Sequence, residues 1–173
     1  MKCRFLNLPL RDGFTNTALE QALLEDTEAS QEFTIAFTGW KPTVLIGNSQ
    51  RSSLDVDQRT CKDRGIPIVR RFSGGQAVFI DKNYIVVNVF GPRPLFPISL
   101  TELRKDFCKV IIRALDQFGI PVNFYEPDNV VVSSPRIRTL GNSGQVIKAK
   151  SIWLQGSIRY ELTEESLKEM LAV

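Results

Sequence analysis

The stretch RRFSGGQAVFID, residues 70–81, is the part of the sequence that most narrows the choice of fold and function. It places two adjacent arginines at the end of a predicted strand, follows them with a Ser-Gly-Gly turn and then begins a new strand. Consecutive glycines let the backbone approach a ligand and turn its N–H groups inward, and arginine offers a fixed fork of donors for phosphate or carboxylate. The stretch therefore predicts an anion pocket at the mouth of a sheet, with a plain hairpin turn carrying two solvated arginines as the alternative.

Hydrophobic periodicity on both sides of this stretch predicts short strands in adjacent runs. The clearest helix begins at the capping box of Ser99 and Glu102 and carries one apolar stripe as far as Phe118. Turn chemistry at residues 81–83 predicts a hairpin. Because strands do not alternate strictly with helices, we expect an α/β (α+β) fold with a mixed, largely antiparallel sheet and flanking helices. Predicted strands cover residues 4–10, 33–38, 44–46, 67–71, 77–80, 84–90, 129–133, 136–140 and 151–162, and predicted helices begin near 15, 55, 99 and 163.

Composition limits the functions open to the chain. Its 173 residues carry a net charge of +3 with a pI near 8.8, which is too weakly basic to argue for nucleic acid. The sequence has no histidine, and this excludes Ser-His-Asp and Cys-His triads and histidine-based zinc sites. The three cysteines form no C-x-x-C pair, so free thiols of a reducing compartment are expected. With no visible secretory signal or long apolar run, a cytoplasmic location is expected.

Taken whole, residues 70–81 strongly resemble the signature R-R-x-S-G-G-G-A-V-[FY]-H-D of the lipoate-protein ligase A family, the biotin/lipoate ligase catalytic domain. The resemblance runs along nearly the whole chain in the same order. Residues 16–20 resemble the helix start N-x-A-L-E, 37–50 resemble F-x-x-W-x-P…V-x-I-G-x-x-Q, and 128–131 resemble the strand D-L-V-V. Residues 138–145 resemble R-K-I-S-G-N-A-Q, and 153–158 resemble the closing H-H-G-T-L strand. Each match is weak alone, but their order and spacing together are specific.

This resemblance implies a fold of the class II synthetase and biotin ligase type. It implies a single catalytic domain over residues 1–173 without the accessory C-terminal domain of many such ligases, which could be a separate protein. ATP and magnesium are the implied cofactors, lipoate is the implied substrate and lipoyl-AMP the activated intermediate. The acyl group would pass to a lysine of a lipoyl domain of a 2-oxoacid dehydrogenase E2 subunit or of the glycine cleavage H protein. Neither nucleic acid nor a membrane is expected as a partner.

Carried over position by position, the resemblance also assigns a site. The substrate and nucleotide pocket would be lined by Arg70, Arg71, Ser73, Gly74, Gly75, Gln76 and Ala77 of the signature and by Gly141, Asn142 and Gln145 of an adenylate loop over residues 141–145. Asp128 would lie near the nucleotide and its metal. The candidates for a catalytic group at the acyl phosphate are Arg138, Thr139 and Lys148. Apolar walls for the acyl chain could come from Val78, Val87 and Val89.

The main departure from the family pattern concerns its lysine in R-K-I-S-G-N-A-Q. An ungapped match puts Thr139 at that position, whereas a one-residue gap puts Arg138 there. Lys148 and Lys150 could replace the lysine from the next strand, or could belong to a solvated hairpin. The other departures are Gln76 for the third glycine, Ile80 for the signature histidine and residues 154–157 for H-H-G-T.

These departures keep three functions open. The leading hypothesis is a lipoate-protein ligase that forms an acyl adenylate. A non-catalytic relative that binds lipoate or nucleotide is the second hypothesis, because Thr139 carries no charge. An octanoyl or lipoyl transferase between carrier proteins is the third. Since no cysteine falls where the octanoyl-transfer relatives carry their nucleophile, the ligase is favoured over the transferase.

Overall fold

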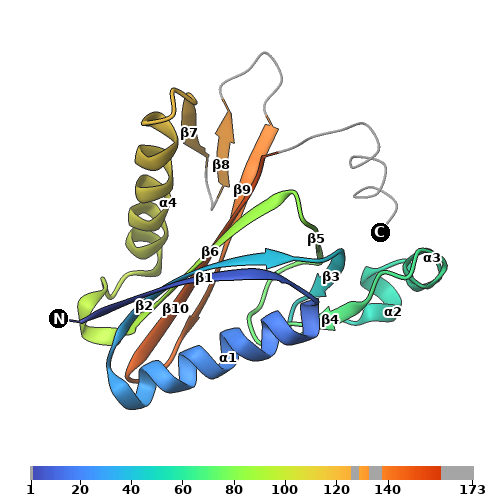
Figure 1. Cartoon of the computed structure of the whole chain (residues 1–173), viewed down its shortest axis with the longest axis horizontal. Coiled ribbons are helices and arrows are strands. Elements are labelled where there is room, and N and C mark those ends of the chain that lie inside the picture. The colour runs from blue at the N-terminus through green and yellow to red at the C-terminus, as the bar shows by residue number, and fades with distance from the viewer. Residues whose placement is uncertain (1, 126–128, 133–137, 161–173) are drawn as a thin grey trace.

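The computed structural model describes residues 2–125, 129–132 and 138–160. For residues 100, 123–125, 129–132 and 138–143 it describes the backbone alone. Two β-sheets and two long helices make up this part of the chain (Figure 1). The helix predicted from residue 163 lies outside the described residues, as does Asp128.

The larger sheet has seven strands in the order β1-β2-β6-β10-β9-β8-β7. Its β1–β2 pair is parallel, and the five other neighbouring pairs are antiparallel. The predicted mixed, largely antiparallel sheet is therefore confirmed. The strands are β1 Cys3–Arg11, β2 Phe33–Trp40, β6 Tyr84–Pro92, β7 Val122–Tyr125, β8 Asn129–Val132, β9 Arg138–Ile147 and β10 Ser151–Arg159.

A smaller sheet of three strands lies beside the N-terminal end of the first long helix (Figure 1). Its central strand β3, Thr43–Ile46, pairs in parallel with β4, Ile68–Arg70, and antiparallel with β5, Val78–Ile80. Two short helices, α2 at Ser52–Asp55 and α3 at Gln58–Asp63, connect β3 to β4. The connection from β4 to β5 is the Ser-Gly-Gly stretch, so the small sheet carries the signature loop.

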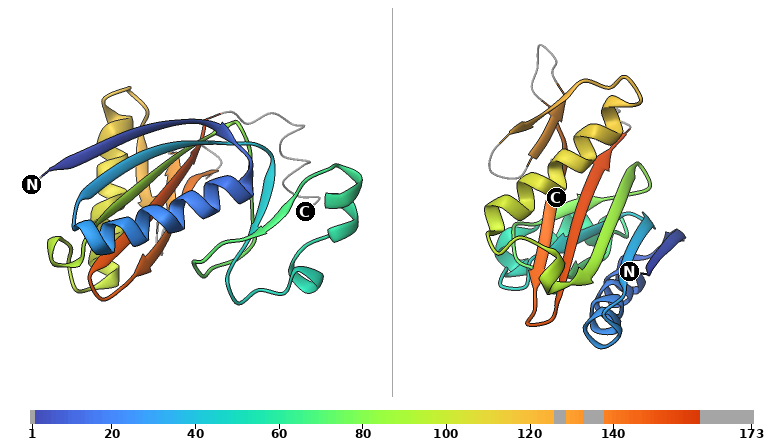
Figure 2. Two further views of the ribbon diagram at one scale, coloured as in Figure 1. Left: turned by 60° about the horizontal axis from the view of Figure 1, so that its bottom comes forward. Right: turned by 90° about the vertical axis from the view of Figure 1, so that its left-hand side faces the viewer.

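The long helices α1, Gly13–Ser30, and α4, Leu100–Asp116, cover opposite faces of the large sheet (Figure 2). Alternation along β10 explains this arrangement, because successive side chains of a strand point to opposite faces. Ile152 and Leu154 join a core cluster with residues of α4, whereas Trp153 joins a cluster with Leu23 and Leu24 of α1. Each face of β10 is therefore buried by a different helix.

Side-chain caps set where the helices begin. The Asp12 carboxylate accepts a hydrogen bond from the Thr15 amide, so α1 starts earlier than the predicted cap at residues 15–17. The Ser99 hydroxyl accepts from the Glu102 amide, which confirms the predicted start of α4. The turn predicted at residues 81–83 is present, because the Asp81 side chain accepts from the Asn83 amide. The predicted hairpin is wrong, because β5 pairs with β3 in the small sheet whereas β6 pairs with β2 and β10 in the large one. Among the described helices, none has the length and hydrophobicity to cross a bilayer.

Candidate functional site

The signature loop connects β4 to β5 and reaches over the face of the large sheet that α1 covers. The ring of Phe72 packs against the ring of Trp153 with a centroid distance of 4.9 Å. Trp153 lies in the same core cluster as Leu23 and Leu24, and Leu19 packs against that cluster too. The loop, α1 and the centre of β10 thus meet in one place, and this junction is the candidate site.

Arg71 holds the loop from beneath. Its Nη2 donates to the carbonyl oxygens of Gly74 at 2.8 Å and Gln76 at 2.7 Å, and its Nε donates to Gly74 at 3.2 Å. Its Nη1 donates to the carbonyl of Leu45 in β3 at 3.0 Å. Burial lowers the pKa of this guanidinium from its usual value, but an arginine stays charged in proteins. The positive charge therefore lies under the loop, and most of its donors fix the backbone.

Arg70 fixes the backbone of the neighbouring turn, residues 47–50. Its Nη1 donates to the carbonyls of Gly47, Asn48 and Gln50 at 3.0, 3.0 and 2.7 Å. The two turns also contact each other directly, because the Asn48 amide donates to the Ser73 carbonyl at 2.9 Å. The adjacent arginines predicted as an anion fork thus bind main-chain oxygens of the two turns and of β3.

The glycines of the loop leave room for a ligand at one position. A Cβ on Gly74 would meet no atom within 4 Å, and both Gly74 and Gly75 are exposed. Their main-chain N–H groups donate to none of the described residues. Gly75 has a φ of 99°, a conformation that side chains disfavour. These amides are placed to bind an anion such as a phosphate.

Ser73 adds a buried hydroxyl to the loop. The residue is only 2% exposed, and its Oγ finds no hydrogen-bond partner in the described part of the chain. Burying a hydroxyl without a partner costs free energy. A polar ligand atom bound at the loop would remove that cost, so Ser73, Gly74 and Gly75 together fit the phosphate or carboxylate of an activated acid.

A buried polar cluster beneath the loop was not predicted from the sequence. Glu20 of α1 is 3% exposed, and its Oε1 accepts from the Gln155 side-chain amide at 2.6 Å. Burial raises the pKa of the Glu20 carboxyl, and hydrogen bonds from Asn88 and Gln155 lower it. The effect of burial is the larger, so the pKa is about 8. The carboxyl is therefore mostly protonated at neutral pH.

Two indole groups fix the orientation of this cluster, because an indole N–H can only donate. Trp153 donates to Asn88 Oδ1 at 2.9 Å, and Gln155 donates to the same oxygen at 3.1 Å. Asn88 Nδ2 donates to Thr38 Oγ1 at 3.3 Å. The same Thr38 oxygen also accepts from the Trp40 indole at 3.0 Å. The partners come from strands far apart in the sequence, and the only sequence signal for them is polar residues inside apolar strands.

The structure does not bring every predicted site residue to the loop. Residues 70–77 lie together, but Gln145 faces α4 on the other side of the sheet and accepts from Arg104 Nε at 3.2 Å. Lys148 lies near the C-terminal end of α1, where it pairs with Glu28 at 3.4 Å. The loop predicted at residues 141–145 is wrong, because these residues lie inside β9, where Gly141 and Asn142 pair in register with Ile158 and Ser157. The β9 residues Arg138 and Thr139 pair with Val132 and Val131. Val87 and Val89 pack on the α4 side, because Asn88 between them faces α1, so they do not wall this site.

The described residues around the signature loop include neither a cluster of metal ligands nor a cysteine. In residues 2–125, 129–132 and 138–160 no three acidic or thiol side chains gather to hold a metal, and Asp128 lies outside these ranges. Cys61 and Cys108 are each 1% exposed, one in the core beside β3 and the other under α4. Cys3 is exposed on the edge strand β1. None of the three cysteines belongs to the signature loop.

Comparison with known proteins agrees with this architecture. Residues 12–173 match the family described as lipoyl protein ligase A/B catalytic domain. The chain is 32% identical over 126 residues to an octanoyltransferase LipM of Moorella thermoacetica, covering 69% of this chain and 45% of that protein. It is 30% identical over 137 residues to a putative lipoate-protein ligase A of Aeropyrum pernix, covering 79% of this chain and 49% of that protein. The chain thus spans about half the length of these curated relatives.

Solved structures show the same fold at low sequence identity. A bi-partite lipoate protein ligase from Thermoplasma acidophilum, studied with its E2 lipoyl domain, superposes with a TM-score of 0.88 at 19% identity. That match covers 100% of this chain and 66% of the other. A lipoate-protein ligase A bound with ATP gives a TM-score of 0.81 at 19% identity, covering 98% of this chain and 71% of the other. With the family match over residues 12–173, the chain belongs to the lipoyl protein ligase A/B catalytic domain family.

Proposed function

We propose that this protein is a lipoate-protein ligase. It would activate lipoate, or a similar medium-chain acid, with ATP to the acyl adenylate and then acylate a lysine of an acceptor protein. The acceptor would be a lipoyl domain of a 2-oxoacid dehydrogenase E2 subunit or the glycine cleavage H protein, in the cytoplasm. Family membership supports handling of such an acyl group.

The position of the cysteines supports the ligase over the transferase, and it is the observation that carries the proposal. Transfer of an acyl group through an enzyme thioester needs an accessible thiol at the site. All three cysteines of the chain lie in described residues, and none is at the signature loop. Burial also raises the pKa of the Cys61 thiol, which makes it a poorer nucleophile. An adenylate route needs no enzyme thiol, so it fits this chain better.

In the adenylate route the loop would hold the reacting anions. The amides of Gly74 and Gly75 would bind a phosphate oxygen, and the Ser73 hydroxyl would donate to the phosphate or to the acid. Arg71 would keep the loop in that shape and add a positive charge beneath it. Within the described residues no three acidic or thiol side chains gather, so Asp128 stays the predicted magnesium ligand.

A non-catalytic lipoate- or nucleotide-binding protein is the second candidate. Arg70 and Arg71 both direct donors to carbonyls, and the family lysine is replaced by Thr139. Fixed positive charge at the acyl phosphate is therefore reduced, and such groups account for a large part of the rate of reactions of this type. Binding would persist without turnover if no other cation replaced the lysine.

One assay separates the candidates. Protein, ATP, magnesium and lipoate are mixed with a purified lipoyl domain, and mass spectrometry follows the acceptor. A ligase adds one lipoyl group only when ATP is present. If the acceptor gains mass from octanoyl carrier protein without ATP, the protein is a transferase. If neither reaction occurs, even with a candidate accessory domain added, the ligase proposal is wrong and the binding function is favoured.

A further inference from the structure

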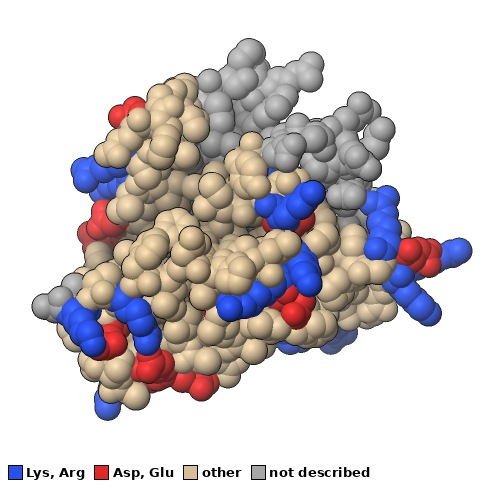
Figure 3. Space-filling model, viewed as in Figure 1, with Lys and Arg blue, Asp and Glu red and all other residues tan. Residues whose placement is uncertain are grey.

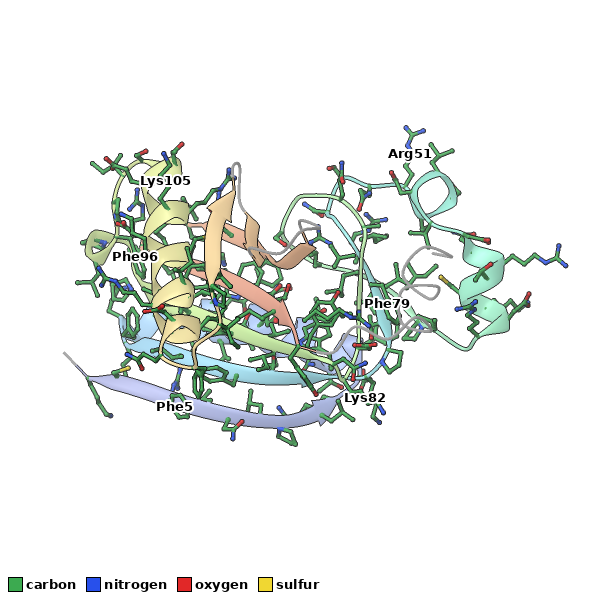
Figure 4. All side chains as sticks on the ribbon, turned by 90° about the horizontal axis from the view of Figure 1, so that it is seen from above. Phe5, Arg51, Phe79, Lys82, Phe96 and Lys105 are labelled. Carbon is green, nitrogen blue, oxygen red and sulfur yellow. The ribbon has the colours of Figure 1, made fainter. Side chains whose placement is uncertain are left out.

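A groove at the far end of α1 from the signature loop has no role in the proposed chemistry. It has a volume of about 490 Å³ and lies between the C-cap of α1, the loop after β6 and the β9–β10 turn. Its apolar lining comes from Pro94, Phe96, Ile98 and Ala149. Phe96 lies beside α4 (Figure 4). Ile98 is 89% exposed, and the neighbouring Leu95 is 51% exposed. Large apolar side chains gathered on one exposed loop mark a surface for another molecule.

The loop that carries these side chains is held in place. Arg93 Nη1 donates to the carbonyls of Phe96 at 3.1 Å and Pro97 at 3.0 Å, and the Arg93 amide donates to the Lys150 carbonyl at 2.9 Å. The Phe96 ring stacks on Phe33 with a centroid distance of 6.2 Å. Ile98 therefore projects from a fixed backbone, so a partner would pay little entropy to order it.

The groove also carries positive charge that no described carboxylate neutralises. Lys150 lines it with an exposed side chain, and within the described residues no acidic group pairs with it. The guanidinium of Arg93 bonds to carbonyl oxygens, whereas nearby Lys148 already pairs with Glu28. Figure 3 shows basic and acidic side chains lying side by side in several places on one face of the molecule. An acidic partner with a central apolar side chain would complement the groove.

We propose that this groove is the docking surface for the acyl-acceptor domain, which would present an acidic patch around an apolar side chain. This inference rests on the proposed function, since that function requires a protein acceptor. Helix α1 links the two places, because the signature loop contacts the cluster around its Leu23 through Phe72 and the groove begins at its C-cap, Gln31, about 12 Å further along the helix. A folded domain of about 100 residues is roughly 30 Å across. Such a domain is wide enough to place its lysine at the loop and its flank on the groove at the same time.

Charge reversal and an apolar-to-acidic change test the groove. Ile98→Asp and Lys150→Glu are compared with Val110→Asp on the exposed face of α4 and Lys62→Glu on α3, both away from the groove. The probe is a lipoyl domain whose acceptor lysine is replaced by glutamine, and its Kd is measured by titration calorimetry. We expect the groove variants to raise this Kd at least about tenfold, which corresponds to about 1.4 kcal/mol, and the control variants to leave it unchanged.

A second measurement distinguishes failure of this inference from failure of the proposed function. Exchange of labelled pyrophosphate into ATP in the presence of lipoate reports adenylate formation without any acceptor. The groove variants should keep the wild-type exchange rate while the KM for the unmodified lipoyl domain rises.

If exchange occurs but the Kd and KM of the groove variants stay at wild-type values, the groove inference is wrong while the ligase proposal stands. If wild type shows no exchange and does not modify the acceptor, the ligase proposal fails, and the Kd values alone decide the groove. Loss of a wild-type dimer in the Ile98 variant would instead assign the groove to a second copy of the chain.

Discussion

At the scale of single residues, Arg71 shows how one side chain can shape a site without facing the ligand. Its guanidinium joins the carbonyls of Leu45, Gly74 and Gln76, which belong to two different segments. Two adjacent arginines in the sequence suggest a phosphate fork, because the pattern cannot reveal which carbonyl oxygens surround them in the fold. Their place at the end of a strand was predicted correctly, but their hydrogen-bond partners required the folded chain.

Replacing Arg71 by lysine should therefore affect both folding and binding. Lysine keeps the charge but cannot reproduce a planar fork of donors, so the carbonyls of the loop and of β3 lose partners. We expect Arg71→Lys to lower the free energy of unfolding by about 1–3 kcal/mol and to weaken binding of a lipoyl-adenylate analogue. Urea denaturation and calorimetric titration measure the two effects. The matched control is Arg59→Lys, whose side chain is 92% exposed and whose pair with Asp63 should contribute little. Equal stability of the two variants would contradict the role assigned to Arg71.

Glu20 should make stability depend on pH. Its carboxyl has a pKa of about 8 in the folded chain and near 4.5 when unfolded, so the folded state binds more protons between these values. Stability should therefore be full below about pH 4.5 and fall by up to about 1.4 kcal/mol per pH unit as pH rises towards 8. Glu20→Gln mimics the protonated acid and does not titrate. We expect this variant to match wild type near pH 5 and to be more stable above pH 8, as measured by urea denaturation. Parallel pH profiles for the two proteins would show that Glu20 is ionised in the folded state.

At the scale of elements, the candidate site depends on two turns that contact each other. A Cβ on Gly47 would collide with the carbonyl oxygen of Gly75, whereas a Cβ on Gly74 would meet nothing. Gly47 stands at the end of β3, and Gly74 lies in the loop that leads to β5. The sequence shows both as ordinary turn glycines, so only the packing of the two turns distinguishes them.

These two glycines give a matched pair of substitutions. Gly47→Ala must displace backbone, so we expect a loss of about 1–3 kcal/mol in the free energy of unfolding. Gly74→Ala should stay within about 0.5 kcal/mol of wild type, because its site is open. If the Gly74 amide contacts a phosphate, however, the added methyl group should weaken binding of the adenylate analogue about tenfold. Thermal denaturation measures the stability of each variant, and titration calorimetry measures its Kd for the adenylate analogue. Loss of stability without loss of binding in Gly74→Ala would remove the loop from the proposed site.

The elements also show how far the sequence predicts this fold. Strong local signals were sufficient for α4, with its cap and its buried apolar residues, and for the turn at residues 81–83. They did not reveal that β5 and β6, on either side of this turn, belong to different sheets. They were insufficient for Gln145, because its face depends on register with β10 across the sheet. The Glu20 cluster was missed for the same reason, since Gln155 lies 135 residues from Glu20 in the sequence. Propensity and spacing act within about a turn or a strand, whereas these contacts arise from strand order.

At the scale of the whole molecule, a buried ion pair ties the small sheet to the large one. Asp81 lies between β5 of the small sheet and β6 of the large sheet, and its Oδ2 accepts from Arg159 at the end of β10 at 3.4 Å. The two side chains are 7% and 3% exposed. The Arg159 guanidinium also lies 5.0 Å from the ring centroid of Tyr84. The position of the signature loop over the large sheet thus depends partly on the ion pair of Asp81 and Arg159.

A double-mutant cycle tests that dependence. Removing one member of a buried pair is strongly destabilising, so Asp81→Asn should cost about 3 kcal/mol, although asparagine can still cap the turn. Arg159→Met should also destabilise, but the double variant should lose less than the sum of the two, because each single change already removes the attraction between the two side chains. Unfolding is followed by the fluorescence of Trp40 and Trp153, which pack in different core clusters. Coincident transitions in wild type, and separate ones in Asp81→Asn, are expected if the pair couples the sheets. Strict additivity with coincident transitions in every variant would mean that the sheets are held together by apolar packing alone, and that the signature loop keeps its place without this pair.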